Sequence, residues 1–125
     1  MTDRHDPAEA AFDEVVRRLV PGYLLKRQRD LNTLRDAVQR GALAEIQDIG
    51  HRLAGSGSTY GFDSLSDLGR ALETSAENED DEAISRLIAA LEGFLEGALT
   101  DVKTAAGGPA ARRSPVRRLL SFTDS

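Results

Sequence analysis

Apolar residues recur at three- and four-residue intervals along most of the chain, the spacing that gathers side chains on one face of an α-helix. The first series lies within residues 8–20 and stops before Pro21-Gly22, so it predicts a short first helix that ends near Val20. The second predicts a longer helix over roughly residues 22–40, with Gly41 in the C-cap region. The two series are Ala8, Phe12, Val15, Val16 and Leu19, then Tyr23, Leu24, Leu31, Leu34 and Val38.

Three more helices are predicted after Gly41. One begins near Ala42 and is stopped by Gly61, and the next opens at Asp63 or Ser64. The acidic run 77–82 then precedes a last helix, which reaches about Thr104. Their stripes are Leu43, Ile46, Ile49, Leu53 and Tyr60; Phe62, Leu65, Leu68, Gly69 and Leu72; and Ile84, Leu87, Ile88, Leu91, Phe94, Leu95, Ala98 and Val102.

Amphipathic helices joined by short connections bury their apolar faces against one another. We therefore expect an all-α protein, an antiparallel four-helix bundle with a short extra N-terminal helix capping one end. Periodicity divides the chain into a flexible leader over residues 1–7, the bundle over 8–104 and a flexible tail over 105–125. The tail is basic because it contains Arg112, Arg113, Arg117 and Arg118.

Composition narrows the function. A chain of 125 residues holds one domain, and the absence of cysteine excludes disulfides and thiolate sites. The net charge is -5 despite the basic tail, so the bundle is acidic and nucleic acid is not an expected partner. No segment approaches roughly 18 uninterrupted apolar residues, and residues 1–7 lack the apolar core of a signal peptide. We expect a cytoplasmic monomer without membrane contact.

The third predicted helix carries a histidine on its outer face. At about 100° per residue, the positions that lie within about 60° of Ile46 are Ile49, Gly50, Leu53, Gly57 and Tyr60, whereas His51 lies about 140° away. Gln47 and Gly55 flank His51 at one-turn spacing, and Ser58 continues the same strip. Gly55 points outward, so helix packing does not explain a glycine here. A residue without a side chain at this position would leave room for another protein to approach the imidazole.

The sequence around His51 resembles the signature of histidine phosphotransfer domains. Residues 49–62 read IGHRLAGSGSTYGF, in which His-x-Leu-x-Gly is followed by a small residue and further glycines. With the helix order on both sides, the resemblance spans about residues 10–104. It implies a phosphorelay intermediate in which His51 accepts a phosphoryl group from a receiver-domain phosphoaspartate and passes it to another receiver aspartate.

The same resemblance implies a phosphocarrier with no ATP site and no autokinase activity. Its partners would be response-regulator receiver domains, with a hybrid histidine kinase as a further candidate. It would need no cofactor of its own, because the receiver brings the bound Mg²⁺. Imidazole has an ordinary pKa of about 6.5, so a neutral ring nitrogen is a competent nucleophile near neutral pH.

One position departs from the family pattern. Family members commonly carry lysine three residues after the histidine, where this chain has Ala54. Arg52, about 100° round the helix from His51, and Arg70 on the next helix are candidates for the compensating charge.

Other functions find less support. The chain has no G-x-x-x-x-G-K-[ST] loop, and the glycines of residues 55–58 lie inside a predicted helix, where they cannot cradle a phosphate. Asp48 and His51 have the spacing of a carboxylate-histidine metal pair, but a second pair is missing, so no metal is expected. A hydrolase with Ser56 or Ser58 as nucleophile and His51 as base is not expected, because no acid that would orient the histidine can be named. The alternative is a non-catalytic helical adaptor or scaffold whose surface histidine is incidental.

Overall fold

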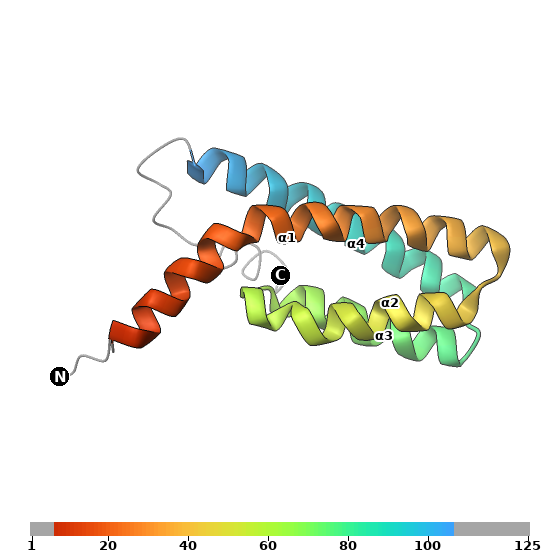
Figure 1. The fold of residues 1–125 in the computed structure, drawn as a ribbon. Coiled ribbons are helices and arrows are strands. Elements are labelled where there is room, and N and C mark those ends of the chain that lie inside the picture. Colours follow the sequence, from red (N-terminus) through yellow and green to blue (C-terminus); the bar gives the residue numbers. More distant parts are fainter. Residues whose placement is uncertain (1–6, 107–125) are drawn as a thin grey trace.

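The computed structural model describes residues 7–106, which fold as an antiparallel bundle of helices (Figure 1). The elements are α1 (Pro7–Arg40), α2 (Leu43–Ser56), the 3₁₀ helix η1 (Ser58–Tyr60), α3 (Asp63–Glu77) and α4 (Asp81–Ala106). Each α-helix packs against the next, and α4 returns to α1, so the four helices form a closed square. The predicted all-α four-helix bundle is confirmed. The predicted leader and tail lie outside the described residues, except for Pro7, which begins α1, and residues 105–106, which end α4.

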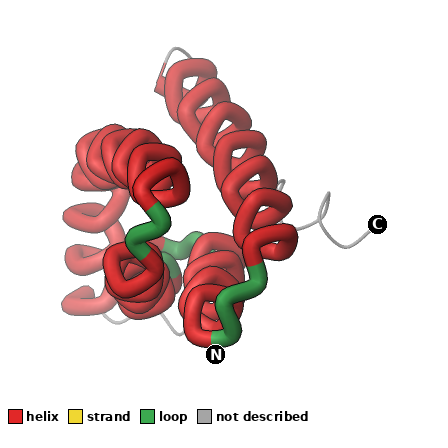
Figure 2. Tube along the Cα trace, turned by 90° about the vertical axis from the view of Figure 1, so that its right-hand side faces the viewer, coloured by secondary structure: helices red, strands yellow, loops and turns green. Residues whose placement is uncertain are grey.

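The helices enclose one apolar core. Figure 2 shows the arrangement of the helices from the end that carries the α1–α2 and α3–α4 turns. Every α-helix contributes side chains at helical spacing, and four of the five predicted stripes supply members, whereas the stripe within residues 8–20 supplies none. The largest fully buried side chains are Phe62, Leu24, Leu31, Leu34, Ile46, Ile49, Leu53, Leu65, Leu72, Ile84, Leu91 and Leu95. The periodicity that predicted the helices therefore also identified the core.

The predicted boundary after Val20 is wrong, because α1 continues through Pro21 as one helix. Proline has no N–H and its ring crowds the preceding turn, so it removes the hydrogen bond to the carbonyl of Arg17. The chain nevertheless stays helical through Val20, Pro21 and Gly22, and the helix bends where its first part leaves the bundle (Figure 1). No separate short helix caps the bundle. None of residues 7–22 is fully buried.

The α1–α2 turn forms as predicted at Gly41. This glycine has a φ of 68°, and the hydrogen bonds from Gly41 N–H to Val38 and from Ala42 N–H to Ala37 satisfy the last carbonyls of α1. Arg40 also connects the two helices, with nitrogens 2.8 Å from carboxylate oxygens of Glu45 and Asp36.

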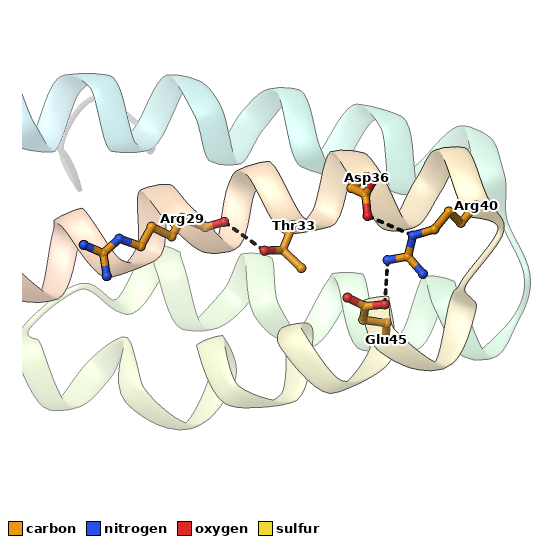
Figure 3. Close-up of polar contacts among 5 residues, drawn as sticks. All are labelled: Arg29, Thr33, Asp36, Arg40 and Glu45. Atoms are coloured by element: carbon orange, nitrogen blue, oxygen red, sulfur yellow. Dashed lines mark hydrogen bonds and ion pairs between the residues drawn. The ribbon is translucent and has the colours of Figure 1, made fainter.

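Figure 3 shows these contacts of Arg40, together with the hydrogen bond that Thr33 donates to the carbonyl of Arg29 one turn earlier in α1. The hydrogen bonds to Glu45 and Asp36 raise the pKa of Arg40 above its ordinary value. Arg40 thus orients the turn between α1 and α2 through two charge-assisted hydrogen bonds.

The third predicted helix is shorter than expected, because α2 ends at Ser56 and a 3₁₀ turn follows. The N–H of Ser58 donates to Ser66 Oγ at 2.8 Å, and Phe62 N–H donates to the carbonyl of Gly57 at 2.8 Å. These bonds draw the chain toward α3, and Gly61 completes the reversal with a φ of 87°. Gly61 therefore ends the helical segment as predicted, but Ser58 lies in the 3₁₀ turn and not in the helix that carries His51.

The two helices on either side of this turn, α2 and α3, pack so closely that their backbones are in direct contact. A Cβ added to Gly69 would lie 2.5 Å from the nitrogen of Ala54 and 2.7 Å from the carbonyl oxygen of Gly50. A Cβ on Gly50 would lie 2.8 Å from the nitrogen of Glu73. The obstructing atoms belong to the backbone, so a larger residue at either glycine must push the helices apart.

We therefore predict that Gly69→Ala lowers the free energy of unfolding by about 1–3 kcal/mol, the usual cost of overpacking a core. Gly93→Ala is the matched control, because a Cβ at Gly93 meets no atom within 4 Å and alanine is the better helix former. Urea unfolding followed by circular dichroism measures both. Equal stability of the two variants would contradict the close contact.

Candidate functional site

The side chain of His51 lies on the outer face of α2 and is 74% exposed. Its Nδ1 lies 3.1 Å from Oε2 of Glu73 on α3, and the Glu73 side chain is 27% exposed. Within the described chain, no hydrogen bond engages Nε2. The predicted exposure of His51 is confirmed, and one of its two ring nitrogens has a fixed partner.

The close contact of the helices places Glu73 beside His51. Gly50 precedes His51 and lies against the backbone of Glu73, so the residues on the open side of this contact become neighbours across the two helices. Glu73 was not among the site residues predicted from the sequence. The available signal was its position one turn after Gly69, a residue already assigned to the apolar stripe.

The hydrogen bond between His51 and Glu73 determines which tautomer of the neutral ring is favoured. A carboxylate only accepts hydrogen bonds, so Nδ1 must carry the proton when it bonds to Glu73. The lone pair of the neutral ring then resides on Nε2. The arrangement presents a nucleophilic nitrogen to solvent and places a negative charge behind the ring.

Two polar pairs continue along the same edge of the α2–α3 contact. Gln47 donates to Glu77 Oε2 at 3.0 Å on one side of His51, and Ser58 donates to the buried Ser66 through both its N–H and its hydroxyl on the other. Gly55 is exposed, and a Cβ there would meet nothing within 4 Å. Space beside His51 is therefore open, and the predicted outward orientation of Gly55 is confirmed.

Neither candidate arginine forms a hydrogen bond or an ion pair with His51 in the described part of the chain. Arg70 NH2 lies 2.9 Å from Asp67 Oδ1 in an exposed pair, and Arg52 is exposed without an ion pair to any described residue. Arg70 nevertheless follows Gly69, whose backbone lies against Ala54. Its Cα therefore lies beside the position where relatives carry lysine, whereas Arg52 lies about 200° from Gly50 and faces away from α3.

A second polar cluster supports the end of α2 and was also missed by the sequence analysis. The Tyr23 hydroxyl lies 2.6 Å from Ser56 Oγ, and the Tyr23 ring stacks on Tyr60 with centroids 4.0 Å apart. The guanidinium of Arg27 lies over the Tyr23 ring, 4.7 Å from its centroid, and pairs with Asp30 at 3.0 Å. These contacts attach α1 to the turn that follows the His51 helix.

The chain belongs to the Hpt domain family, which it matches over residues 23–105. Membership implies histidine phosphotransfer in a phosphorelay, performed by a phosphocarrier without kinase activity and with two-component partners such as receiver domains. No curated protein and no solved structure matches the chain significantly.

Residues 7–106 show neither a membrane-spanning helix nor a metal-binding cluster. No helix there is long and apolar enough to cross a membrane. Within the same range, no three His, Cys, Asp or Glu residues lie close enough together to hold a metal ion. Asp48, which has the spacing of a metal pair with His51, is exposed on α2.

We predict that the neutral imidazole of His51 carries its proton on Nδ1, and that Glu73→Leu removes the preference for this tautomer. Long-range ¹H–¹⁵N correlation spectra above neutral pH distinguish the two tautomers, and His51→Gln identifies the signals, because His5 is the only other histidine. Glu73→Gln tests the charge separately, since an amide oxygen can still accept the Nδ1 proton. A tautomer unchanged in Glu73→Leu would show that Glu73 does not select it.

Proposed function

We propose that this protein is a phosphorelay intermediate that accepts a phosphoryl group on His51 from a receiver-domain phosphoaspartate and passes it to another receiver aspartate. The observation that carries the proposal is the exposed imidazole of His51, held through Nδ1 by Glu73, within a chain of the Hpt domain family. Receiver domains are the proposed partners, a hybrid histidine kinase is a further one, and the cytoplasm is the proposed location.

The transfer step follows from the tautomer. The Nε2 lone pair of His51 attacks the phosphorus, the P–O bond to the receiver aspartate breaks, and that aspartate leaves as a carboxylate. The ring gains positive charge as the N–P bond forms, and the Glu73 carboxylate beside Nδ1–H stabilises it, as a buried carboxylate does for the histidine of a hydrolytic triad. The reverse step returns the phosphoryl group to a receiver aspartate.

His51 needs little further machinery from its own chain. In this proposal the partner receiver supplies the Mg²⁺ and the groups that neutralise the transferring phosphoryl. The protein supplies a nucleophile in a fixed orientation on a rigid helix and an open surface at Gly55. An incidental histidine on an adaptor would need neither the Glu73 contact nor the unfilled position one turn away, which favours the relay over the scaffold.

The central prediction is that His51→Gln keeps the helical fold and abolishes phosphate acceptance, because changes at exposed positions usually alter stability by less than about 0.5 kcal/mol. Incubation with a phosphorylated receiver domain, followed by detection of acid-labile, base-stable phosphate, measures acceptance. Circular dichroism checks the fold. Undiminished labelling of His51→Gln would remove the proposed site.

A separate prediction concerns access. Gly55→Gln should keep or slightly increase helix stability, because glycine is the poorer helix former, yet transfer should fall by at least tenfold. The receiver aspartate must come within a few ångströms of the imidazole, and a long side chain one turn away obstructs that approach. Gly55→Ala separates bulk from backbone effects, and its transfer rate should stay within a few-fold of wild type. Normal transfer by Gly55→Gln would show that the open position has no access role.

We further propose that Arg70, rather than Arg52, takes the place of the family lysine. Arg70 is adjacent to the Gly69–Ala54 contact, and its present partner, Asp67, forms an exposed pair of the kind worth about 0–1 kcal/mol. A phosphoryl group on His51 can therefore compete for the guanidinium. Arginine also offers paired N–H donors that match phosphate oxygens.

Arg70→Ala should shorten the lifetime of phosphorylated His51 or slow its formation several-fold, and Ala54→Lys in that background should restore part of the loss. Arg52→Ala tests the other candidate. Arg86→Ala, on α4, is the control for loss of a surface charge. Transfer and hydrolysis kinetics that do not differ between Arg70→Ala and Arg86→Ala would contradict the compensation.

A further inference from the structure

Glu77, the last residue of α3, holds an exposed carboxylate on the same edge of the α2–α3 contact as His51. Its Oε2 accepts a hydrogen bond from Gln47 Nε2 at 3.0 Å, and Gln47 lies one helical turn before His51 on α2. Glu77 also follows Glu73 by one turn, and Glu73 contacts the His51 ring at 3.1 Å. Both relations place the Glu77 carboxylate roughly 6–10 Å from the imidazole, since residues one turn apart are neighbours on a helix.

No ion pair engages Glu77 within residues 7–106. Its hydrogen-bond partner is a neutral amide, and the last turn of α3 contains no basic residue. Arg40, in the α1–α2 turn at the same end of the bundle (Figure 2), is already held by Glu45 and Asp36. The chain that follows Glu77 adds acidic residues over 79–82. This end of the bundle therefore has an excess of negative charge.

The two carboxylates beside His51 have different effects once a phosphoryl group is attached to Nε2. Nδ1 keeps its proton, so the phosphorylated ring can carry a positive charge that Glu73 offsets. The phosphoryl group itself carries about two negative charges near neutral pH, and Glu77 presents a like charge to it. Glu73 therefore stabilises the ring, whereas Glu77 repels the group that the ring carries.

We infer that Glu77 is a determinant of the direction of phosphoryl flow through this site. Its carboxylate raises the free energy of phosphorylated His51 relative to the free histidine, which favours passing the group to a receiver over retaining it on the bundle. The inference rests on the proposed function and deepens it. Glu77 acts through its charge, because its hydrogen bond goes to Gln47 and not to His51.

Glu77 and Arg70 lie on opposite sides of His51 along the α2–α3 edge. Arg70 adjoins the Gly69–Ala54 contact, toward the η1 turn, and Glu77 lies toward the α3–α4 turn. The proposed attraction by Arg70 and the repulsion by Glu77 thus act from two separate positions. Because Ala54 supplies no charge between them, Glu77 decides how far the balance moves toward release.

The expected size of the effect follows from Coulomb's law. Glu77 is exposed, so its field passes largely through water, and the Debye length at physiological ionic strength is about 8 Å. One carboxylate at about this distance from a doubly charged phosphoryl group changes the equilibrium constant for transfer about two- to fivefold.

A competition between two proteins in one tube measures this effect. Wild type labelled with ¹⁵N and unlabelled Glu77→Gln share phosphate through a small amount of one phosphorylated receiver domain, and mass spectrometry of the intact chains reads both phosphorylated fractions. The receiver serves both proteins alike, so its own properties cancel. Glu77→Gln should hold a ratio of phosphorylated to free protein about two- to fivefold higher. Its amide oxygen can still accept from Gln47, so only the charge is lost.

Matched variants separate the local charge from net charge and from structure. Glu77→Lys reverses the charge and should roughly square the ratio. Glu96→Gln removes an exposed carboxylate from α4, which does not contact α2, and should share phosphate equally with wild type. At about 1 M salt, where the Debye length is about 3 Å, the advantage of Glu77→Gln should nearly disappear.

A second tube separates failure of the inference from failure of the proposed function. Phosphoramidate with excess ammonia replaces the receiver: His51 Nε2 attacks the phosphorus, the P–N bond of phosphoramidate breaks and ammonia leaves, and the reverse step returns the group. The same ratio between wild type and Glu77→Gln is expected. Exchange in this tube but with no receiver domain would refute the relay, and the ratio would still test Glu77. A His51 that accepts phosphate from neither source would overturn both.

Three results would overturn the inference about Glu77. The first is equal phosphate on wild type and Glu77→Gln at low salt, or less on the variant. The second is an equal gain in Glu96→Gln, which would assign the effect to net charge. The third is a gain that persists undiminished at about 1 M salt, because an electrostatic effect over this distance is screened there.

Discussion

The direct contact between the backbones of α2 and α3 is the constraint on which the rest of the structure depends. Gly50, Gly57 and Gly69 leave no room for a Cβ, so these helices lie closer than side chains would otherwise allow. That distance brings Glu73 within hydrogen-bonding reach of His51, and it allows Ser66 to accept hydrogen bonds from Ser58. Glycine is a poor helix former, so the helices give up local stability to achieve this geometry.

The sequence predicted what periodicity controls and missed what depends on two elements at once. The core stripes, Gly41 as a helix-ending residue and the exposure of His51 follow from spacing along a single helix. The continuity of α1 was missed, because Pro21 was interpreted as a helix end although proline can also bend a helix. Glu73 was missed because its role depends on how closely α3 approaches α2, which spacing within either helix does not determine.

The site combines a nucleophile of fixed orientation with little charge of its own. Glu73 places a carboxylate behind the imidazole, where it favours attack by Nε2, while Ala54 stands where relatives carry a cation. Opposite charges therefore have different sources in our account. The negative charge beside the ring comes from Glu73 within the bundle. In the proposed transfer, the positive charge that holds the phosphoryl group comes mainly from the receiver, and Arg70 is the proposed contributor from this chain.

The central claim is that Nε2 of His51 becomes phosphorylated because Nδ1 is held by Glu73. The most direct measurement is heteronuclear ³¹P–¹⁵N magnetic resonance of the ¹⁵N-labelled protein after transfer from a phosphorylated receiver domain. We predict a single phosphorus signal coupled to Nε2 of His51, with the proton retained on Nδ1. A phosphoryl group on Nδ1, on His5 or on a carboxylate would contradict the claim.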